Sequence, residues 1–126
     1  MRIFKTKWFA RFARRARIGD RLLQEAIERA ERGIVDADLA GGVIKQRLAR
    51  QGQGRSGGYR VLIAYQRSRR AVFLYGFAKS ERDNIADDEL TTLRDIATAW
   101  LGMDSSRLER ALAEGRAEEV NYEQKT

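Results

Sequence analysis

The stretch GVIKQRLARQGQGRSGGYRVLIAYQRSRRAVFLYGFAK, residues 42–79, decides the fold. Apolar and polar residues alternate over residues 43–48, and this period of two predicts a strand. Residues 59–66 and 71–78 are rich in Val, Ile, Phe and Tyr, and Ser68-Arg69 between them predicts a turn, so the two runs form an antiparallel hairpin. The last run is apolar on both faces, as expected at the centre of a sheet.

Helical spacing of apolar residues flanks this sheet on both sides. Upstream, a short strand over residues 2–4 precedes a helix over residues 5–17, and a second helix begins at Asp20 as N-cap and stops at Gly33. Downstream, a helix follows the carboxylates Asp87 and Asp88, and a short last helix ends before Gly115. The predicted fold class is α+β, with two N-terminal helices, a small antiparallel sheet of three to four strands, and C-terminal helices.

Length and composition limit the remaining possibilities. The 126 residues fit one domain, expected over residues 1–115, followed by a polar tail over residues 116–126. No apolar run approaches the roughly 18 residues of a membrane span, and the first ten residues do not resemble a signal peptide, so we expect a cytoplasmic protein with no membrane partner. The chain has no Cys and no His, so no metal site or other cofactor is expected.

The positive charge is concentrated in the first part of the chain. Residues 1–70 hold 18 Lys and Arg against six Asp and Glu, whereas residues 71–126 hold seven against 12. Clustered cations gain from counterion release on a phosphate backbone, so a polyanionic partner is indicated. A solvated surface of mixed charge is the alternative interpretation.

Candidate site residues lie in and after the central strands. Lys45 and Arg47 are two residues apart on a strand, so their side chains leave the same face, and Arg60 lies on the following strand. Arg50 and Arg55 flank the Gly-rich loop over residues 50–58. This loop joins two strands and lacks the P-loop spacing, so its glycines allow either close approach of a partner or a long hairpin connection.

The segment after the third strand contributes two further cations. Lys79 and Arg82 are expected beside the end of the strand that carries Arg60. The alternative is that residues 79–84 form a charged connector that caps the next helix.

Three motifs in order resemble the RelE/HigB family of toxins from bacterial type II toxin–antitoxin systems. They are V-I-K-x-R at residues 43–47, G-x-G-R-S-G-G-x-R at residues 52–60 and Y-G-F-A-K-S-E-R-D-N-I at residues 75–85. The resemblance covers roughly residues 1–100 and is closest to the HigB-like branch, which is encoded beside a helix-turn-helix antitoxin. It implies a RelE-like fold and an endoribonuclease (an mRNA interferase) that inhibits translation by cutting mRNA in the ribosomal A site.

The resemblance also implies roles for individual residues. Lys45, Arg47, Arg60 and Lys79 match the catalytic cations of the family, and Arg50, Arg55 and Arg82 are expected to bind RNA. Relatives often have a second basic residue after the position of Lys79 and a Tyr several residues further on, where this chain has Ser80 and Ala86. Tyr59 and Tyr75 are not obvious substitutes for that Tyr.

The predicted mechanism uses no metal. Arg60 clamps the phosphate, Lys45 accepts the proton of the attacking 2′-OH, and Lys79 or Arg82 assists the leaving oxygen. The products then carry 2′,3′-cyclic phosphate and 5′-OH ends.

Other functions and partners follow from the same features. A ParE-like DNA gyrase inhibitor has the same fold, and a non-catalytic nucleic-acid-binding module or a purely structural partner protein would also fit a basic chain. The expected partners are mRNA on the ribosome and an antitoxin whose acidic segment neutralises the patch or blocks ribosome entry. Operator DNA is expected to bind only through the toxin–antitoxin complex.

Overall fold

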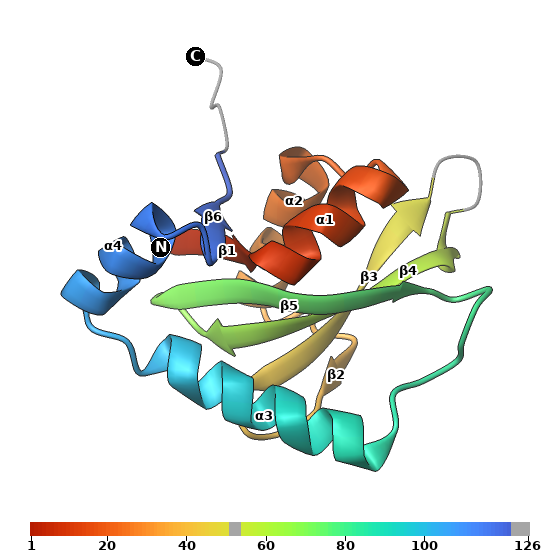
Figure 1. Cartoon of the computed structure of the whole chain (residues 1–126). Helices are drawn as coiled ribbons and strands as arrows, with labels where there is room; N and C mark the ends of the chain where they lie inside the picture. The colour runs from red at the N-terminus through yellow and green to blue at the C-terminus, as the bar shows by residue number, and fades with distance from the viewer. Residues whose placement is uncertain (51–53, 122–126) are drawn as a thin grey trace.

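A computed structural model covers residues 1–50 and 54–121 of the chain, and the side chains of residues 50 and 54–56 lie outside the description. Figure 1 shows a central sheet between two sets of helices. The elements in chain order are β1 (Arg2–Thr6), α1 (Lys7–Ala16), α2 (Asp20–Glu31), β2 (Ala37–Asp38), β3 (Val43–Arg50), β4 (Gly54–Gln66), β5 (Arg70–Ala78), α3 (Asp87–Leu101), α4 (Ser105–Ala113) and β6 (Ala117–Glu119). The predicted α+β class is confirmed.

The sheet has six strands in the order β2-β3-β4-β5-β1-β6. All neighbours are antiparallel except β1 and β5, which run parallel. The predicted number of three to four strands is therefore too small. The extra strands β2 and β6 contain two and three residues, too few to produce a period that sequence patterns reveal.

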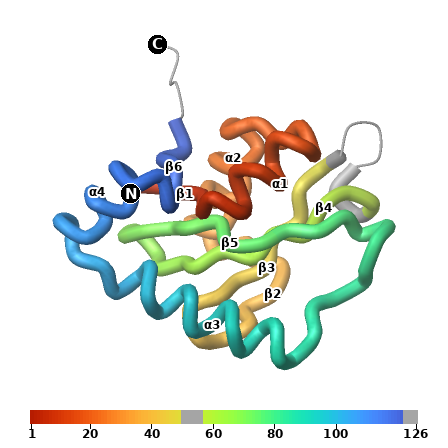
Figure 2. Tube along the Cα trace, in the orientation of Figure 1, coloured from red at the N-terminus to blue at the C-terminus, as the bar shows by residue number. Residues whose placement is uncertain are grey.

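The expectation of a polar tail from residue 116 is wrong for residues 117–119. These residues form β6, which pairs with β1 although the two strands come from opposite ends of the chain (Figure 2). Ala117 and Val120 are buried, and the Val120 N–H donates to the Ile3 carbonyl at 2.8 Å. Burial of these two apolar side chains fixes a segment whose composition is otherwise polar.

The Gly-rich connection is shorter than predicted. β4 already begins at Gly54, where it pairs with Arg50 after a register shift next to Leu48. Residues 54–58 are therefore strand rather than loop, and the strand continues without a break to Gln66. The hairpin of β4 and β5 agrees with the prediction.

The two faces of the sheet bury separate apolar cores. One core joins Phe9 of α1 and Leu23 of α2 to Val61, Ile63 and Phe73 of the sheet. The other joins Leu93, Ala97 and Trp100 of α3 to Leu62 and Val72. β5 contributes to both cores, so its apolar residues on both faces have the predicted explanation.

Helix ends follow the predicted capping with one exception. Asp104 caps α4 through a bond from the Arg107 N–H at 2.8 Å, and Gly33 and Gly115 have positive φ angles of 84° and 75°. The N-cap of α2 is Gly19, not Asp20. The Asp20 carboxylate instead accepts from the Lys5 ammonium at 2.7 Å, because a long-range ion pair replaces the local cap.

Within the described ranges, the longest and most apolar helix still falls short of what crossing a membrane requires.

Candidate active site

Three of the predicted cations share one face of the sheet. Arg47 of β3 lies directly opposite Arg60 of β4, and Lys45 lies opposite Leu62 on the same face. Exposure rises along β3 from fully buried Val43, which packs toward α3, through half-buried Lys45 to exposed Arg47. The cover that α3 gives to this face therefore ends at Lys45, and the predicted geometry of the first two cations is confirmed.

Arg60 is the least accessible of these cations, with 7% of its surface exposed. It lies between Arg47 on one side and Phe77 of β5 on the other, and its Nη1 is 3.5 Å from the Tyr59 carbonyl. Two like charges opposite each other on neighbouring strands destabilise a sheet. Sequences break such local rules mainly where a ligand supplies the missing counter-charge.

Side chains replace the missing neighbour strand at Arg47. β2 pairs with β3 only at Lys45 and Ile44, so the backbone of Arg47 has no strand partner on that side. The Asp36 carboxylate accepts the Arg47 N–H at 2.5 Å, and the Arg29 guanidinium donates to the Arg47 carbonyl at 2.6 Å. Asp36 also lies 3.8 Å from Nε of Arg47, so one carboxylate fixes both the backbone and the guanidinium.

Lys79 follows β5 and lies next to β4. Its N–H donates to the Gly58 carbonyl at 2.9 Å, which places its backbone two residues from Arg60 along β4. Its ammonium is 3.5 Å from the Asp83 carboxylate, an exposed pair that stabilises little and that a phosphate can replace.

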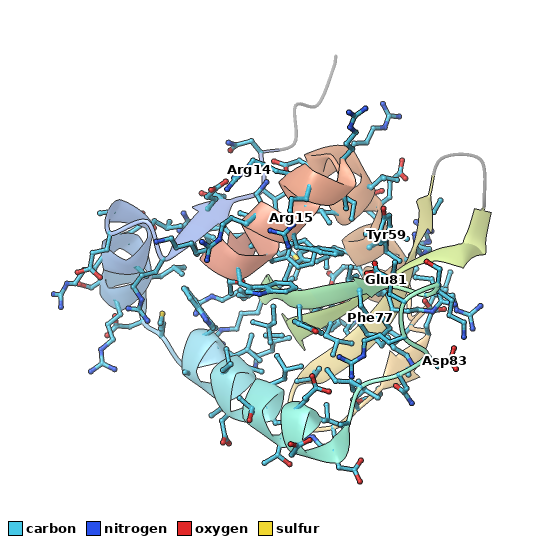
Figure 3. All side chains as sticks on the ribbon, turned by 45° about the vertical axis from the view of Figure 1, so that its right-hand side comes forward. Arg14, Arg15, Tyr59, Phe77, Glu81 and Asp83 are labelled. Atoms are coloured by element: carbon cyan, nitrogen blue, oxygen red, sulfur yellow. The ribbon has the colours of Figure 1, made fainter. Side chains whose placement is uncertain are left out.

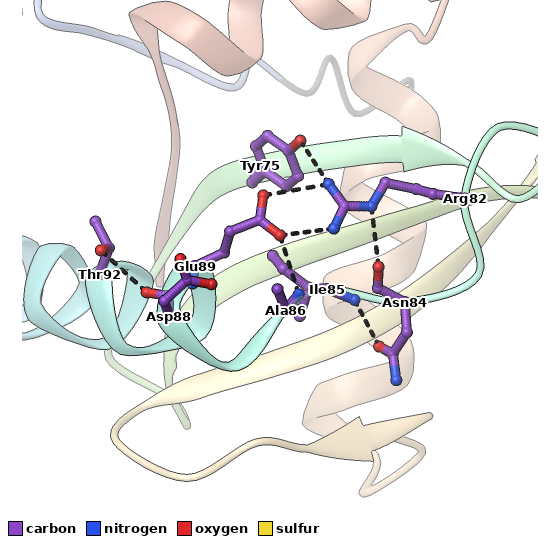
Figure 4. Close-up of polar contacts among 8 residues, drawn as sticks. All are labelled: Tyr75, Arg82, Asn84, Ile85, Ala86, Asp88, Glu89 and Thr92. Carbon is purple, nitrogen blue, oxygen red and sulfur yellow. Dashed lines mark hydrogen bonds and ion pairs between the residues drawn. The ribbon is translucent and has the colours of Figure 1, made fainter.

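Arg82 is engaged by the protein rather than open to solvent. Figure 4 shows its guanidinium between β5 and α3, where it donates to both oxygens of Glu89 at 2.6 and 3.2 Å, to the Asn84 carbonyl at 2.9 Å and to the Tyr75 hydroxyl at 3.4 Å. The group also lies over the Phe77 ring, 5.4 Å from its centroid. These contacts agree with the alternative interpretation of a charged connector, and RNA binding by Arg82 stays a prediction.

The Arg82–Glu89 pair predicts an acid-sensitive contribution to stability. The hydrogen bonds from Arg82, and after them the one from the Ala86 N–H, lower the pKa of Glu89 from 4.5 to about 2. Because the folded pKa is the lower one, the contribution is complete above about pH 4.5 and is lost as the pH falls toward 2. We expect an NMR titration of the Glu89 carboxyl to give a midpoint near 2. A midpoint near 4.5 would show that the pair does not form in solution, and Glu109, on α4, serves as a second exposed carboxylate paired with an arginine.

The two remaining predicted RNA-binding residues, Arg50 and Arg55, have side chains outside the described residues. The four catalytic candidates and Arg82 are thus the predicted residues whose positions are known.

Tyr75 is the functional candidate that sequence reasoning set aside. Alternation along β5 puts it on the face that carries Phe77 and Arg60, and its ring stacks on Trp8 at a centroid distance of 4.6 Å. Tyr59, in contrast, is buried among the residues that pack under α1 and α2. The hydroxyl of Tyr75 therefore reaches the polar network of Arg82, whereas Tyr59 belongs to the core.

A hollow of about 420 Å³ lies between α1 and the end of β5. Figure 3 shows four of its lining residues, which come from α1, β4, β5 and the segment after β5: Arg15, Tyr59, Phe77 and Glu81. No pattern in the sequence predicts this hollow, because its walls come from four separate segments. Among residues 1–50 and 54–121, no cluster of three or more Asp or Glu side chains has the arrangement of a metal site.

Comparison with known families gives one match. A family model described as the RelE toxin of the RelE/RelB toxin–antitoxin system matches residues 1–120. A search of curated proteins found no significant match.

Proposed function

The chain belongs to the RelE family of toxins from toxin–antitoxin systems, and on this premise we propose that it is a ribosome-dependent endoribonuclease that cuts mRNA in the A site. The family implies an antitoxin partner. The observation that supports cleavage is the placement of Lys45, Arg47 and Arg60 on one uncovered end of the sheet, with Lys79 beside them.

The proposed reaction is an in-line transfer within the RNA. The 2′-oxygen forms a bond to the adjacent phosphorus while its proton passes to Lys45, and the bond from phosphorus to the 5′-oxygen breaks as that oxygen takes a proton from Lys79. Lys45 suits the role of acceptor because it forms no hydrogen bond or ion pair with another described residue. Arg60 and Arg47 stabilise the charge that gathers on the phosphate, which is the largest contribution that fixed cations make to such reactions.

The position of Arg47 supports this role. The contacts from Asp36 and Arg29 hold its backbone, so its guanidinium needs little reorganisation when a phosphate arrives.

The test is primer extension on mRNA bound to purified ribosomes, with a reaction lacking ribosomes beside it. We expect cuts at A-site codons only when ribosomes are present, with 5′-OH fragments that polynucleotide kinase labels directly. If the protein stops cell growth but cuts no mRNA in either reaction, the nuclease proposal is wrong, and inhibition of DNA gyrase becomes the function to measure.

Metal removal provides a separate prediction. We expect EDTA, added to a concentration below that of Mg²⁺, to leave the cleavage rate unchanged, because the proposed steps use only Lys and Arg side chains. EDTA binds transition metals before Mg²⁺, so the ribosome keeps its Mg²⁺ while trace metals are removed. A rate that falls with EDTA and returns with added Zn²⁺ or Mn²⁺ would contradict the proposed mechanism.

A further inference from the structure

The exposed face of α1 carries a stripe of cations that have no acidic partners. Lys7, Arg11 and Arg15 follow one another at four-residue spacing and are all exposed. None of the three forms an ion pair or side-chain hydrogen bond with another residue in the described ranges. Their neighbour Arg14 is 3.5 Å from Glu118, and Figure 3 shows Arg14 and Arg15 on the outer side of the helix. We call Lys7, Arg11 and Arg15 the α1 stripe.

Helix stability does not explain this composition. The first turn of α1 has no acidic residue and begins with Lys7, although the positive end of the helix dipole favours carboxylates there. The other long helices follow the rule, with Asp20 in the first turn of α2 and Asp87 in that of α3. Like charges at i and i+4 within the α1 stripe destabilise the helix further. A sequence that keeps such a pattern indicates a ligand that supplies negative charge.

The same face offers little apolar surface to a protein partner. The apolar side of α1, with Phe9, Ala10 and Ala13, is already buried against the sheet. Trp8 is the one large apolar residue of α1 that is exposed, at 40%, and its ring is stacked between Phe12 and Tyr75. Cores of protein interfaces are depleted of charged residues, whereas contacts to a nucleic-acid backbone are made mainly by Arg and Lys.

We propose that the α1 stripe binds the phosphate backbone of structured RNA. The stripe extends about 12 Å along the helix, enough for several phosphate contacts. α1 covers the face of the sheet opposite to the one that carries Lys45 and Arg47, so one molecule can contact two RNA segments at once. This inference rests on the proposed function, for which the stripe supplies a contact to ribosomal RNA while mRNA occupies the active site.

The test compares two triple variants that remove the same charge. The first is Lys7→Ala, Arg11→Ala, Arg15→Ala, and the control is Arg32→Ala, Arg107→Ala, Arg110→Ala, which removes exposed cations of α2's end and α4. Binding to purified ribosomes and to a plain RNA duplex is measured over a series of KCl concentrations. We expect the first variant to bind both RNAs about tenfold or more weakly, with a plot of log K against log salt shallower by roughly two to three. The control is expected to change little.

The outcomes separate this inference from the proposed function. Equal affinities and salt slopes for the two variants would overturn the role of the α1 stripe, even if wild-type protein cuts mRNA. If the first variant keeps its RNA binding but no longer binds the antitoxin, the stripe is a protein-binding surface and the inference is also wrong. Wild-type protein that binds the duplex through the stripe but cuts no mRNA would contradict only the nuclease proposal. Thermal melts of both variants show whether either has lost its fold.

Discussion

Replacement of Arg60 by alanine is expected to lower the rate of ribosome-dependent mRNA cleavage by about 100-fold or more, the loss typical when a fixed electrostatic stabiliser is removed. Arg60 lies directly opposite Arg47 on the sheet and packs beside Phe77, so its position is set by the strands rather than by a mobile loop. A guanidinium held in this way stabilises charge on the phosphate with little reorganisation. The measurement is a single-turnover rate on mRNA bound in the A site.

Burial of Arg60 makes a second variant necessary. Arg60→Lys keeps the charge but loses the forked geometry, so we expect it to fold like the wild type and to recover only part of the rate. Arg67→Ala, at an exposed arginine just after β4, is the matched control and should cleave normally. The assignment is wrong if Arg60→Ala cuts within about threefold of the wild-type rate. It is also wrong if Arg60→Ala and Arg60→Lys lose the same activity and both are unfolded at the assay temperature.

The central strands could be predicted because their information is local. Alternation over residues 43–48 placed Lys45 and Arg47 on one face, and a tight turn after β4 left one register for the hairpin. The distribution of apolar residues on β5 predicted its central position for the same reason. Local periodicity was therefore sufficient to bring three of the four catalytic candidates onto one surface.

The partners of these residues could not be predicted because they depend on long-range contacts. Asp36 reaches Arg47 only because β2 is short and the strand edge is open at that position. Arg82 is held by Glu89, which lies on the far side of an irregular segment. The burial of Arg60 likewise depends on what packs over the sheet, and no spacing in the sequence encodes it.

Arg70→Ala is expected to have the largest effect on stability, lowering the free energy of unfolding by about 3 kcal/mol and the melting temperature by roughly 10 °C. Arg70 is 8% exposed, and its Nη1 donates to the carbonyls of Trp100 at 2.8 Å and Met103 at 2.9 Å. These carbonyls lie at the C-terminal end of α3, where backbone acceptors lack helical partners and a cation is favoured by the helix dipole. Burial, together with the nearby cations Arg69 and Arg2, lowers the pKa of Arg70 from its usual value, so its charge is retained there against a desolvation cost.

The neighbouring residue supplies the matched control for Arg70. Arg69 is exposed and donates to the Leu101 carbonyl at the same helix end, at 3.0 Å, so Arg69→Ala removes an equal charge from a site that water can reach. We expect it to cost less than about 1 kcal/mol. Arg70→Met, which keeps most of the buried volume, separates packing from hydrogen bonding: if the two carbonyl contacts matter, it should recover less than half of the loss. Equal melting temperatures for Arg70→Ala and Arg69→Ala would show that the end of α3 is not held by the buried guanidinium, because only the buried site leaves carbonyls without either a donor or water.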